Sequence, residues 1–152
     1  MNDYLIHVKS TLDKVMNDLV TSLGATYPGL KGVDIDNMVE SDEAFKAENP
    51  TLLWQFLALR PVPRDPLYNL EFLVGAKTTS DAANYTLTSL TNDLRQSFEV
   101  EQRIEVGDYS GETAVLDTGY FLIIENTFTP QQYEHMSGIR FFSIRARGAR
   151  SV

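Results

Sequence analysis

Cysteine is absent from this chain of 152 residues, which excludes disulfide bonds, thiolate nucleophiles and thiolate zinc sites. Long apolar runs are absent as well. No stretch approaches the ~18 residues of a transmembrane helix, so we expect no membrane partner. The first ten residues lack a basic segment followed by an apolar one, so they do not resemble a secretory signal. These absences are compatible with a reducing cytoplasm, and the length suits a single domain spanning residues 1–152.

Recognisable catalytic motifs are also missing. The sequence contains no G-x-S-x-G, H-E-x-x-H, Walker or G-x-G-x-x-G pattern. Its two histidines are isolated: His7 lies beside an apolar helical stripe, and His135 lies in a polar segment without a readable triad partner. Residues 34–43 resemble a calcium loop, but Met38 and Phe45 stand where an EF-hand needs oxygen ligands. We therefore predict that the protein is not an enzyme and holds neither a metal ion nor a cofactor.

Positive charge is scarce except at the end of the chain. Residues 1–139 hold 21 acidic and 9 basic side chains, whereas residues 140–152 hold four arginines and no acid. Residues 33–48 form an acidic stretch, with six acids against one lysine. Such an asymmetry indicates contacts with partners of the opposite charge.

Two segments carry the three- and four-residue apolar spacing of an amphipathic helix. The first follows Asn2 or Asp3, either of which is a good N-cap, and ends before Gly24. Its stripe comprises Leu5, Val8, Leu12, Val15, Met16, Leu19 and Leu23. The second begins near Ser80 or Asp81. Its stripe comprises Ala83, Leu87, Leu90, Leu94 and Phe98. Both helices are polar on the opposite side, so each is expected to cover one face of a sheet.

The strands are expected in four segments with apolar or alternating patterns, at residues 51–59, 67–76, 119–128 and 138–146. Residues 103–106 and 113–117 are expected either to form a small extra hairpin or to extend the third strand. The main element order is then α-β-β-α-β-β. We predict an α+β fold in which two helices pack on one face of a mostly antiparallel sheet.

A long connection separates the first helix from the first of these strands. Compact domains rarely contain a connection as long as residues 25–49 unless it is functional or disordered. We interpret it as an extended acidic arm that lies on the domain or on a neighbour. The strands are apolar on both faces, although two helices can cover only one. Either this arm or another subunit is therefore expected to cover the second face.

The basic C-terminal strand and tail, residues 138–152, have three interpretations. On a strand, Arg145 and Arg147 share one face and Arg140 lies on the other. These arginines either stand on a solvated strand end, contact an acidic patch on another protein, or contact the phosphates of a nucleic acid. The net charge of -12 on the other residues repels a polyanion, which disfavours the third interpretation.

The layout of these segments resembles that of the tail terminator, or tail-completion, proteins of long-tailed bacteriophages such as lambda. A helix opens the chain, a long loop leads to "ENPTLLWQFLAL" and a hairpin, and "LYNLEFLVGAKTTSDAANYTL" runs from strand straight into helix. The resemblance rests on element order and spacing over most of residues 1–128, without a diagnostic motif. The last strand and its basic tail go beyond the lambda-like pattern.

The resemblance implies a structural protein of the virion, assembled in the host cytoplasm, that forms a hexameric ring. Such a ring caps the tail tube, stops its polymerisation and docks to the head connector, and DNA passes through it without specific binding. Contacts within a ring are heterologous, so each subunit needs two different, complementary surfaces. The acidic arm and the basic tail are candidates for that pair, and the proline-rich loop 60–66 is expected to touch a neighbouring protein. The candidate interaction residues are Asp34, Asp36, Glu40, Asp42, Glu43, Arg60, Arg64, Arg140, Arg145, Arg147 and Arg150.

Other functions fit the same sequence. Within the structural class, the protein is alternatively a neck or baseplate ring component of a phage or a contractile injection machine. From a different class, it is a small nucleic-acid-binding α+β domain that uses the arginine strand. An enzyme with a shallow site is the least favoured alternative.

Overall fold

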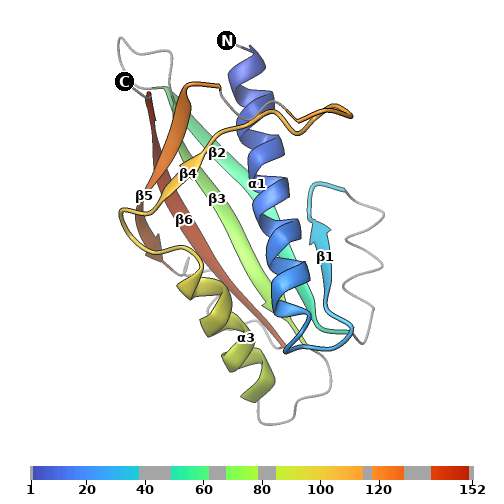
Figure 1. Cartoon of the computed structure of the whole chain (residues 1–152). Helices are drawn as coiled ribbons and strands as arrows, with labels where there is room; N and C mark the ends of the chain where they lie inside the picture. Colours follow the sequence, from blue (N-terminus) through green and yellow to red (C-terminus); the bar gives the residue numbers. More distant parts are fainter. Residues whose placement is uncertain are drawn as a thin grey trace.

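The computed structural model describes residues 2–37, 49–61, 68–78, 85–114, 118–128 and 138–150. In chain order, the elements are α1 (Asn2–Leu23), β1 (Lys31–Asp34), β2 (Thr51–Pro61), β3 (Tyr68–Lys77), α3 (Tyr85–Gln96), β4 (Arg103–Glu105), β5 (Tyr120–Phe128) and β6 (Ile139–Arg150). The strands form one curved sheet, a half-barrel, and α1 and α3 both lie in front of it in Figure 1.

The sheet has the strand order β1-β2-β3-β6-β5-β4. β1 is parallel to β2, and the other neighbouring strands pair in antiparallel fashion. The predicted fold is therefore wrong: the order is α-β-β-β-α-β-β-β, and the sheet is a mixed half-barrel of six strands. The strand β1 was missed because its four residues are too few for a period-two pattern to be recognised. β4 lies within residues 103–106, which were expected either to form a hairpin with residues 113–117 or to extend the third strand, and it pairs with β5.

The first helix has the bounds that its apolar stripe predicts. Val8, Leu12 and Met16 recur along one side of α1 and are buried against the sheet. The helix ends where the Gly24 amide donates a 3.0 Å hydrogen bond to the Val20 carbonyl oxygen. The polar side of α1 faces outward, and its apolar side covers one face of the sheet, which we call the inner face.

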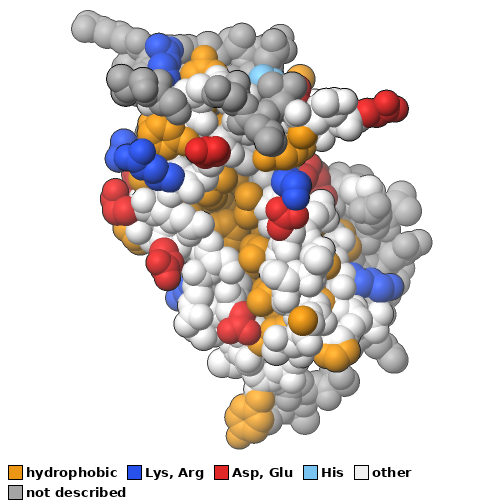
Figure 2. Space-filling model, viewed as in Figure 1, with side chains coloured by type: hydrophobic (Ala, Val, Ile, Leu, Met, Phe, Trp, Pro, Cys, Tyr) orange, Lys and Arg blue, Asp and Glu red, His pale blue; other side chains and the backbone are white. Residues whose placement is uncertain are grey.

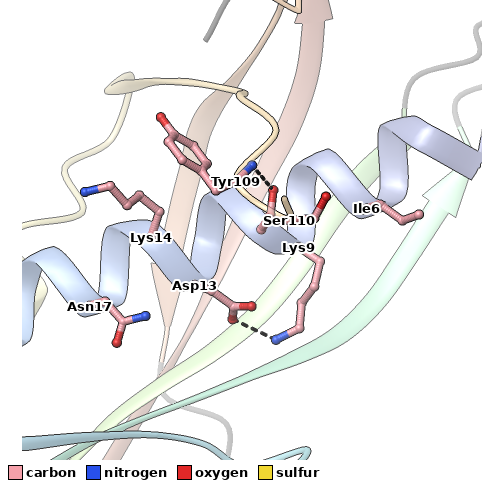
Figure 3. Close-up of a pocket in the computed structure, with 8 residues that line it drawn as sticks. Ile6, Lys9, Asp13, Lys14, Asn17, Tyr109 and Ser110 are labelled. Atoms are coloured by element: carbon pink, nitrogen blue, oxygen red, sulfur yellow. Dashed lines mark hydrogen bonds and ion pairs between the residues drawn. The ribbon is translucent and has the colours of Figure 1, made fainter. Parts of the chain in front are cut away.

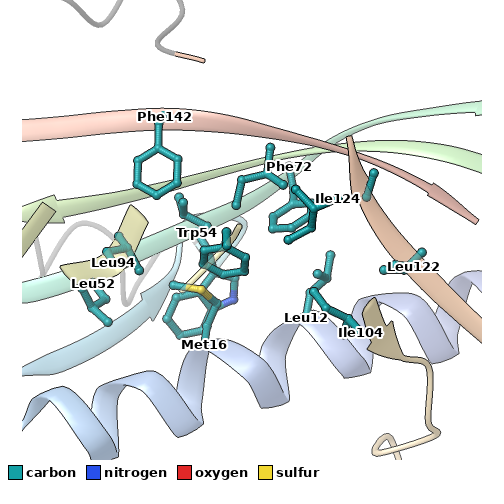
Figure 4. Packing of buried hydrophobic residues seen from close by; sticks show 14 of the residues in the cluster. Leu12, Met16, Leu52, Trp54, Phe72, Leu94, Ile104, Leu122, Ile124 and Phe142 are labelled. Atoms are coloured by element: carbon teal, nitrogen blue, oxygen red, sulfur yellow. The ribbon is translucent and has the colours of Figure 1, made fainter. Parts of the chain in front are cut away.

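The second helix, α3, completes the cover of the inner face. Its buried residues are Leu87, Leu90 and Leu94. The expected start near Ser80 or Asp81 lies outside the described residues, and the described helix begins at Tyr85. Strand residues that join the same core include Leu52, Trp54, Leu70, Phe72, Val74, Leu122, Ile124, Phe142, Ile144 and Ala146, several of them drawn in Figure 4. Every second residue of the central strands β3 and β6 thus points into one apolar core between sheet and helices.

β1 lies within the segment that the sequence predicts to be an extended arm. It pairs with the start of β2, from Lys31 opposite Thr51 to Asp34 opposite Trp54. Gly32 is required there, because a Cβ atom at this position would lie 2.6 Å from Val20 Cγ2 and 3.0 Å from the Trp54 ring. β1 therefore packs closely against both the end of α1 and β2. Part of the segment that was predicted to be an extended arm belongs to the sheet.

The outer face of the sheet, opposite the helices, divides into two halves. One half is apolar and buried within the single chain. It comprises Val33, Leu53, Leu73, Ile139 and Phe141, with Ile35 packed beside them. The other half is formed by the later residues of β6 with their neighbours on β3 and β5, and it is more polar: Arg145 and Arg147 lie there beside Phe121 and Ile123. Within the single chain, one half of the second face is therefore buried, and cover of the other half by another subunit stays a prediction.

Candidate functional site

The register of β6 distributes the candidate arginines over both faces. Arg145 is paired with Glu71 of β3 and Arg147 with Ile123 of β5, which places both arginines on the outer face. Arg140 is paired with Ala76 and lies on the inner side. The sequence predicts this division correctly, because side chains alternate along a strand.

Arg145 stands over an aromatic ring on the outer face. Its guanidinium carbon lies 4.7 Å from the centroid of the Phe128 ring. Its Nε atom lies 3.7 Å from Oε2 of Glu71, while Oε1 of Glu71 accepts a 2.9 Å hydrogen bond from the Ser143 hydroxyl. The Arg145 side chain remains 44% exposed, so the ring and the carboxylate orient the guanidinium without removing it from solvent.

Two further arginines extend this surface toward the β4 edge. Arg147 Nε lies 4.0 Å from Oε1 of Glu125, and both side chains are 47% exposed. Arg103 of β4 is stacked over Phe121, with its guanidinium carbon 4.8 Å from the ring centroid. We call the set Arg103, Phe121, Phe128, Arg145 and Arg147 the arginine–aromatic surface. The sequence does not identify Arg103 or the two phenylalanines. Phe121 and Phe128 are seven residues apart, so simple alternation would place them on opposite faces, and the β-bulge between Ile124 and Asn126 brings them to the same face.

The other two arginines lie apart from that surface. Arg140 is half-buried and donates a 3.0 Å hydrogen bond from Nη1 to the main-chain oxygen of Ile139. Arg150 is exposed at the last position of β6, opposite Tyr120. Of the four C-terminal arginines, the structure therefore brings only Arg145 and Arg147 together.

The acidic candidates lie at the β1 edge of the sheet. Asp34 is already engaged within the chain, since its Oδ2 accepts a 2.6 Å hydrogen bond from Lys9 Nζ. Asp36 is exposed, and its Oδ1 accepts a 3.0 Å hydrogen bond from Gln55 Nε2. Three further acidic candidates, Glu40, Asp42 and Glu43, lie outside the described residues, as does Arg64. Arg60 belongs to β2, but its side chain is not described.

A second candidate site is an open groove of about 490 Å³ along the solvent side of α1. Figure 3 shows Lys9, Asp13 and Lys14 projecting from the helix into the groove, with Tyr109 and Ser110 on the facing loop. Lys9 donates to Asp13 and Lys14 donates to Asp18, at 2.8 and 2.5 Å, so each lysine is paired with an acid four residues later. The positive charges of both lysines in the groove are therefore balanced by carboxylates of the same helix.

Lys9 is the best-anchored charge of this groove. Burial opposes its charged form, but hydrogen bonds and charge interactions with Asp13 and Asp34 outweigh burial and raise the pKa of Lys9. Asp13 Oδ1 also accepts a 2.9 Å hydrogen bond from Trp54 Nε1. These contacts connect α1 to β1 and β2, which indicates a structural role for the polar side of the helix.

The loop beside the groove is fixed by α1. The Thr11 hydroxyl donates to the Gly107 carbonyl oxygen and accepts from the Gly107 amide, both at 3.0 Å. His7 Nε2 lies 3.5 Å from Asp108 Oδ2. Hydrogen bonds from Ser110 to the Asp108 carboxylate lower the pKa of Asp108, and the nearby His7 lowers it further. The Ser10 hydroxyl is bonded to main-chain atoms of residues 7, 107 and 109, so it is positioned as a tether of the loop.

Other kinds of site were sought among the described residues. No cluster of three or more His, Cys, Asp or Glu side chains in that part of the chain is arranged to hold a metal ion. None of its helices is long and apolar enough to span a membrane. Figure 2 shows the helix-covered face, where charged side chains are scattered and apolar side chains are visible along the middle. The sequence matches no protein-family model and no curated protein.

Proposed function

We propose that this protein is a non-enzymatic structural component of a phage virion, a ring that caps the tail tube and joins it to the head connector. The resemblance of the sequence layout to tail terminator proteins motivates this function. The observation that carries it is the arginine–aromatic surface. Arg103 and Arg145 are held over phenylalanine rings. Arg145 and Arg147 remain about half exposed beside carboxylates of the same chain.

Such a surface suits contact with another protein. Arginine and aromatic residues are enriched at protein–protein interfaces, and the most important contacts there are often arginines. The aromatic rings beneath Arg103 and Arg145 limit the rotation of the guanidinium groups, so less side-chain entropy is lost on binding. The apolar half of the outer face is buried within the chain, whereas this polar half remains accessible to a partner.

Contact with nucleic acid is the competing function for the same arginines. Glu71 and Glu125 lie beside Arg145 and Arg147, so the local charge that a phosphate would meet is reduced. The remainder of the chain is acidic, which repels a polyanion at longer range. Both features favour a protein partner, either a second subunit, the tail tube protein or the head-connector protein. They favour equally another ring component of a phage neck or baseplate.

The test is the assembly state of the purified protein, alone and mixed with tail tubes. We expect light scattering to report a closed oligomer at high protein concentration, or electron microscopy to show a ring at the end of a tube. A stable ring interface should bury at least ~1,200 Å² per subunit pair. A protein that stays monomeric under both conditions would contradict the proposed function.

A further inference from the structure

Two sheet edges of this molecule are open over part of their length. β1 pairs with β2 only from Thr51 to Trp54, with one further hydrogen bond from the Ile35 amide to the Trp54 carbonyl oxygen. Among the described residues, none pairs with the outer side of β2 from residue 55 to residue 61. Its backbone donors and acceptors on that side are available to another strand.

The opposite edge is open in the same way. β4 pairs with β5 from Phe121 to Ile123, and Ile124 is bonded to residues 101 and 102. Within the described part of the chain, nothing pairs with the outer side of β5 from residue 125 to residue 128. Within the described residues, each side of the sheet therefore has one open segment.

A β-bulge lies near the start of each open segment. The register of β2 against β3 shifts between Phe56 and Ala58, and that of β5 against β6 shifts between Ile124 and Asn126. A bulge increases the local twist and bends the strand, so both segments are locally bent.

The directions of the two edges are complementary. β2 and β6 are both antiparallel to β3, and β5 is antiparallel to β6, so β5 runs opposite to β2. When a second copy with the same orientation is placed beside the first, its β5 edge meets the β2 edge of the first copy in antiparallel fashion. This is the pairing mode with the more stable hydrogen-bond geometry.

The charges on the two edges are complementary as well. The open β2 segment contains Arg60 and no acid, whereas the open β5 segment contains Glu125 and no base. On the outer face, Asp36 is bonded to Gln55 at the start of the open β2 segment. Arg145 lies on β6, the strand next to β5, and is paired with Asn126 of the open β5 segment. Joining the two edges brings an exposed acid of one copy toward the arginine–aromatic surface of the next.

We infer that the open edges of β2 and β5 pair with each other between neighbouring copies of this chain, so that their sheets join around a ring. This inference rests on the proposed function, because only a head-to-tail ring uses two different edges of each subunit. The open segments are the C-terminal parts of two oppositely directed strands, so they lie at opposite ends of the sheet. Successive copies are therefore staggered, and the strands tilt relative to the ring axis, as strands do when a sheet closes on itself.

Cross-linking tests the inference directly, because the chain contains no cysteine of its own. The test variant combines Ala58→Cys on β2 with Asn126→Cys on β5, because an antiparallel register with these residues opposite each other keeps the pairing within the two open segments. A short bismaleimide links cysteines that lie close together. We expect the double variant to give a ladder of covalent oligomers on a denaturing gel. Each single variant should remain monomeric, because a heterologous contact does not bring equal positions together.

The matched control replaces the β2 position by Asn17→Cys, on the exposed side of α1, and keeps Asn126→Cys. It should give no ladder. If light scattering shows a ring but the Ala58→Cys/Asn126→Cys variant stays monomeric, the edge pairing is wrong and the proposed function survives. Efficient dimers from a single variant would mean a two-fold contact and would also overturn the pairing. A strict monomer, alone and with tail tubes, would overturn both proposals.

Discussion

The carboxylate of Asp13 helps to hold three elements together, namely α1, β1 and β2. Its Oδ1 accepts hydrogen bonds from the indole nitrogen of Trp54 at 2.9 Å and from Lys9 Nζ at 2.8 Å. Trp54 is 6% exposed, so its indole N–H has little access to water. Lys9 in turn reaches Asp34 at the end of β1. One side chain of α1 therefore fixes the helix against both β1 and β2.

We predict that Asp13→Ala lowers the free energy of unfolding by about 1–3 kcal/mol, because a buried indole donor loses its acceptor. The matched control is Asp18→Ala on the same helix. Asp18 is also paired with a lysine but is 63% exposed, so its loss should cost at most about 0.5 kcal/mol. Urea unfolding of both variants gives the comparison. Equal destabilisation by the two substitutions would show that the Trp54 contact contributes nothing.

Gly75 shows what a sequence does not reveal at this scale. A glycine in the middle of a strand is usually a weakness. Here a Cβ atom at Gly75 would lie 2.4 Å from the Phe141 ring, which fills the space over the glycine on the outer face. Only the register of β3 against β6, set by long-range pairing, brings these two residues together. Composition and local spacing contain no information on that partnership.

At the scale of elements, Tyr27 connects the turn after α1 to α3. Its hydroxyl lies 2.7 Å from Oδ2 of Asp93, to which it donates, and 2.7 Å from the Ser89 hydroxyl. Burial raises the pKa of Tyr27, and the Asp93 carboxylate raises it further, although the Ser89 hydrogen bond acts in the other direction. The neutral phenol is therefore favoured in the folded protein. This contact joins two helices that are far apart in the sequence.

We predict that Tyr27→Phe destabilises the protein by roughly 1–3 kcal/mol at neutral pH, since a hydrogen bond to a charged group is lost. Because the folded pKa is raised, this stabilisation is complete below the ordinary tyrosine pKa of 10.0 and is lost as pH rises through the folded value. The difference between wild type and variant should therefore shrink in alkali. Tyr85→Phe is the control, because Tyr85 is 79% exposed at the start of α3. Thermal unfolding at neutral and alkaline pH decides whether the hydroxyl matters.

The long elements were predictable, and the short strand β1 was not. The bounds of α1 followed from a stripe of apolar residues repeated over five turns, a signal that few alternatives can produce. The strands β2, β3, β5 and β6 began within one residue of their expected starts. β1 escaped notice because Val33 and Ile35 provide only two alternating apolar positions inside an acidic stretch. Its parallel pairing with β2, which makes the sheet mixed, is a long-range property that local patterns do not encode.

The candidate site was predictable in part, and for a similar reason. Alternation along β6 separated Arg145 and Arg147 from Arg140, as the register confirms. The neighbours of those arginines come from other strands: Glu71 from β3, Phe128 from β5. Side-by-side placement of β3, β6 and β5 depends on the whole topology, in which β6 is inserted between strands that precede it in the chain. The sequence therefore identified the arginines but not the surface that they build.

At the scale of the whole molecule, charge is distributed between two ends of one sheet. The exposed acid Asp36 lies beside the β1 edge, and the arginine–aromatic surface lies toward the β4 edge on the same outer face. Three strands, β2, β3 and β6, separate β1 from β5 in the sheet order. The two charged regions therefore cannot meet within one molecule, but they can meet between neighbours that are arranged head to tail.

The last prediction concerns the two outer-face arginines. Replacing Arg145 and Arg147 by alanine should weaken ring formation or docking to the tail tube. Monomer stability should change little, because both side chains are nearly half exposed. The control variant Lys14→Ala/Lys31→Ala removes the same charge from exposed positions elsewhere and should assemble normally.

Gel-shift titrations with duplex DNA separate the protein and nucleic-acid functions. If Arg145 and Arg147 neutralise two phosphates, binding should fall with salt at a log–log slope of about -1.8. Tight binding with that slope, lost in the arginine variant and kept in the lysine variant, would replace the ring by a nucleic-acid function.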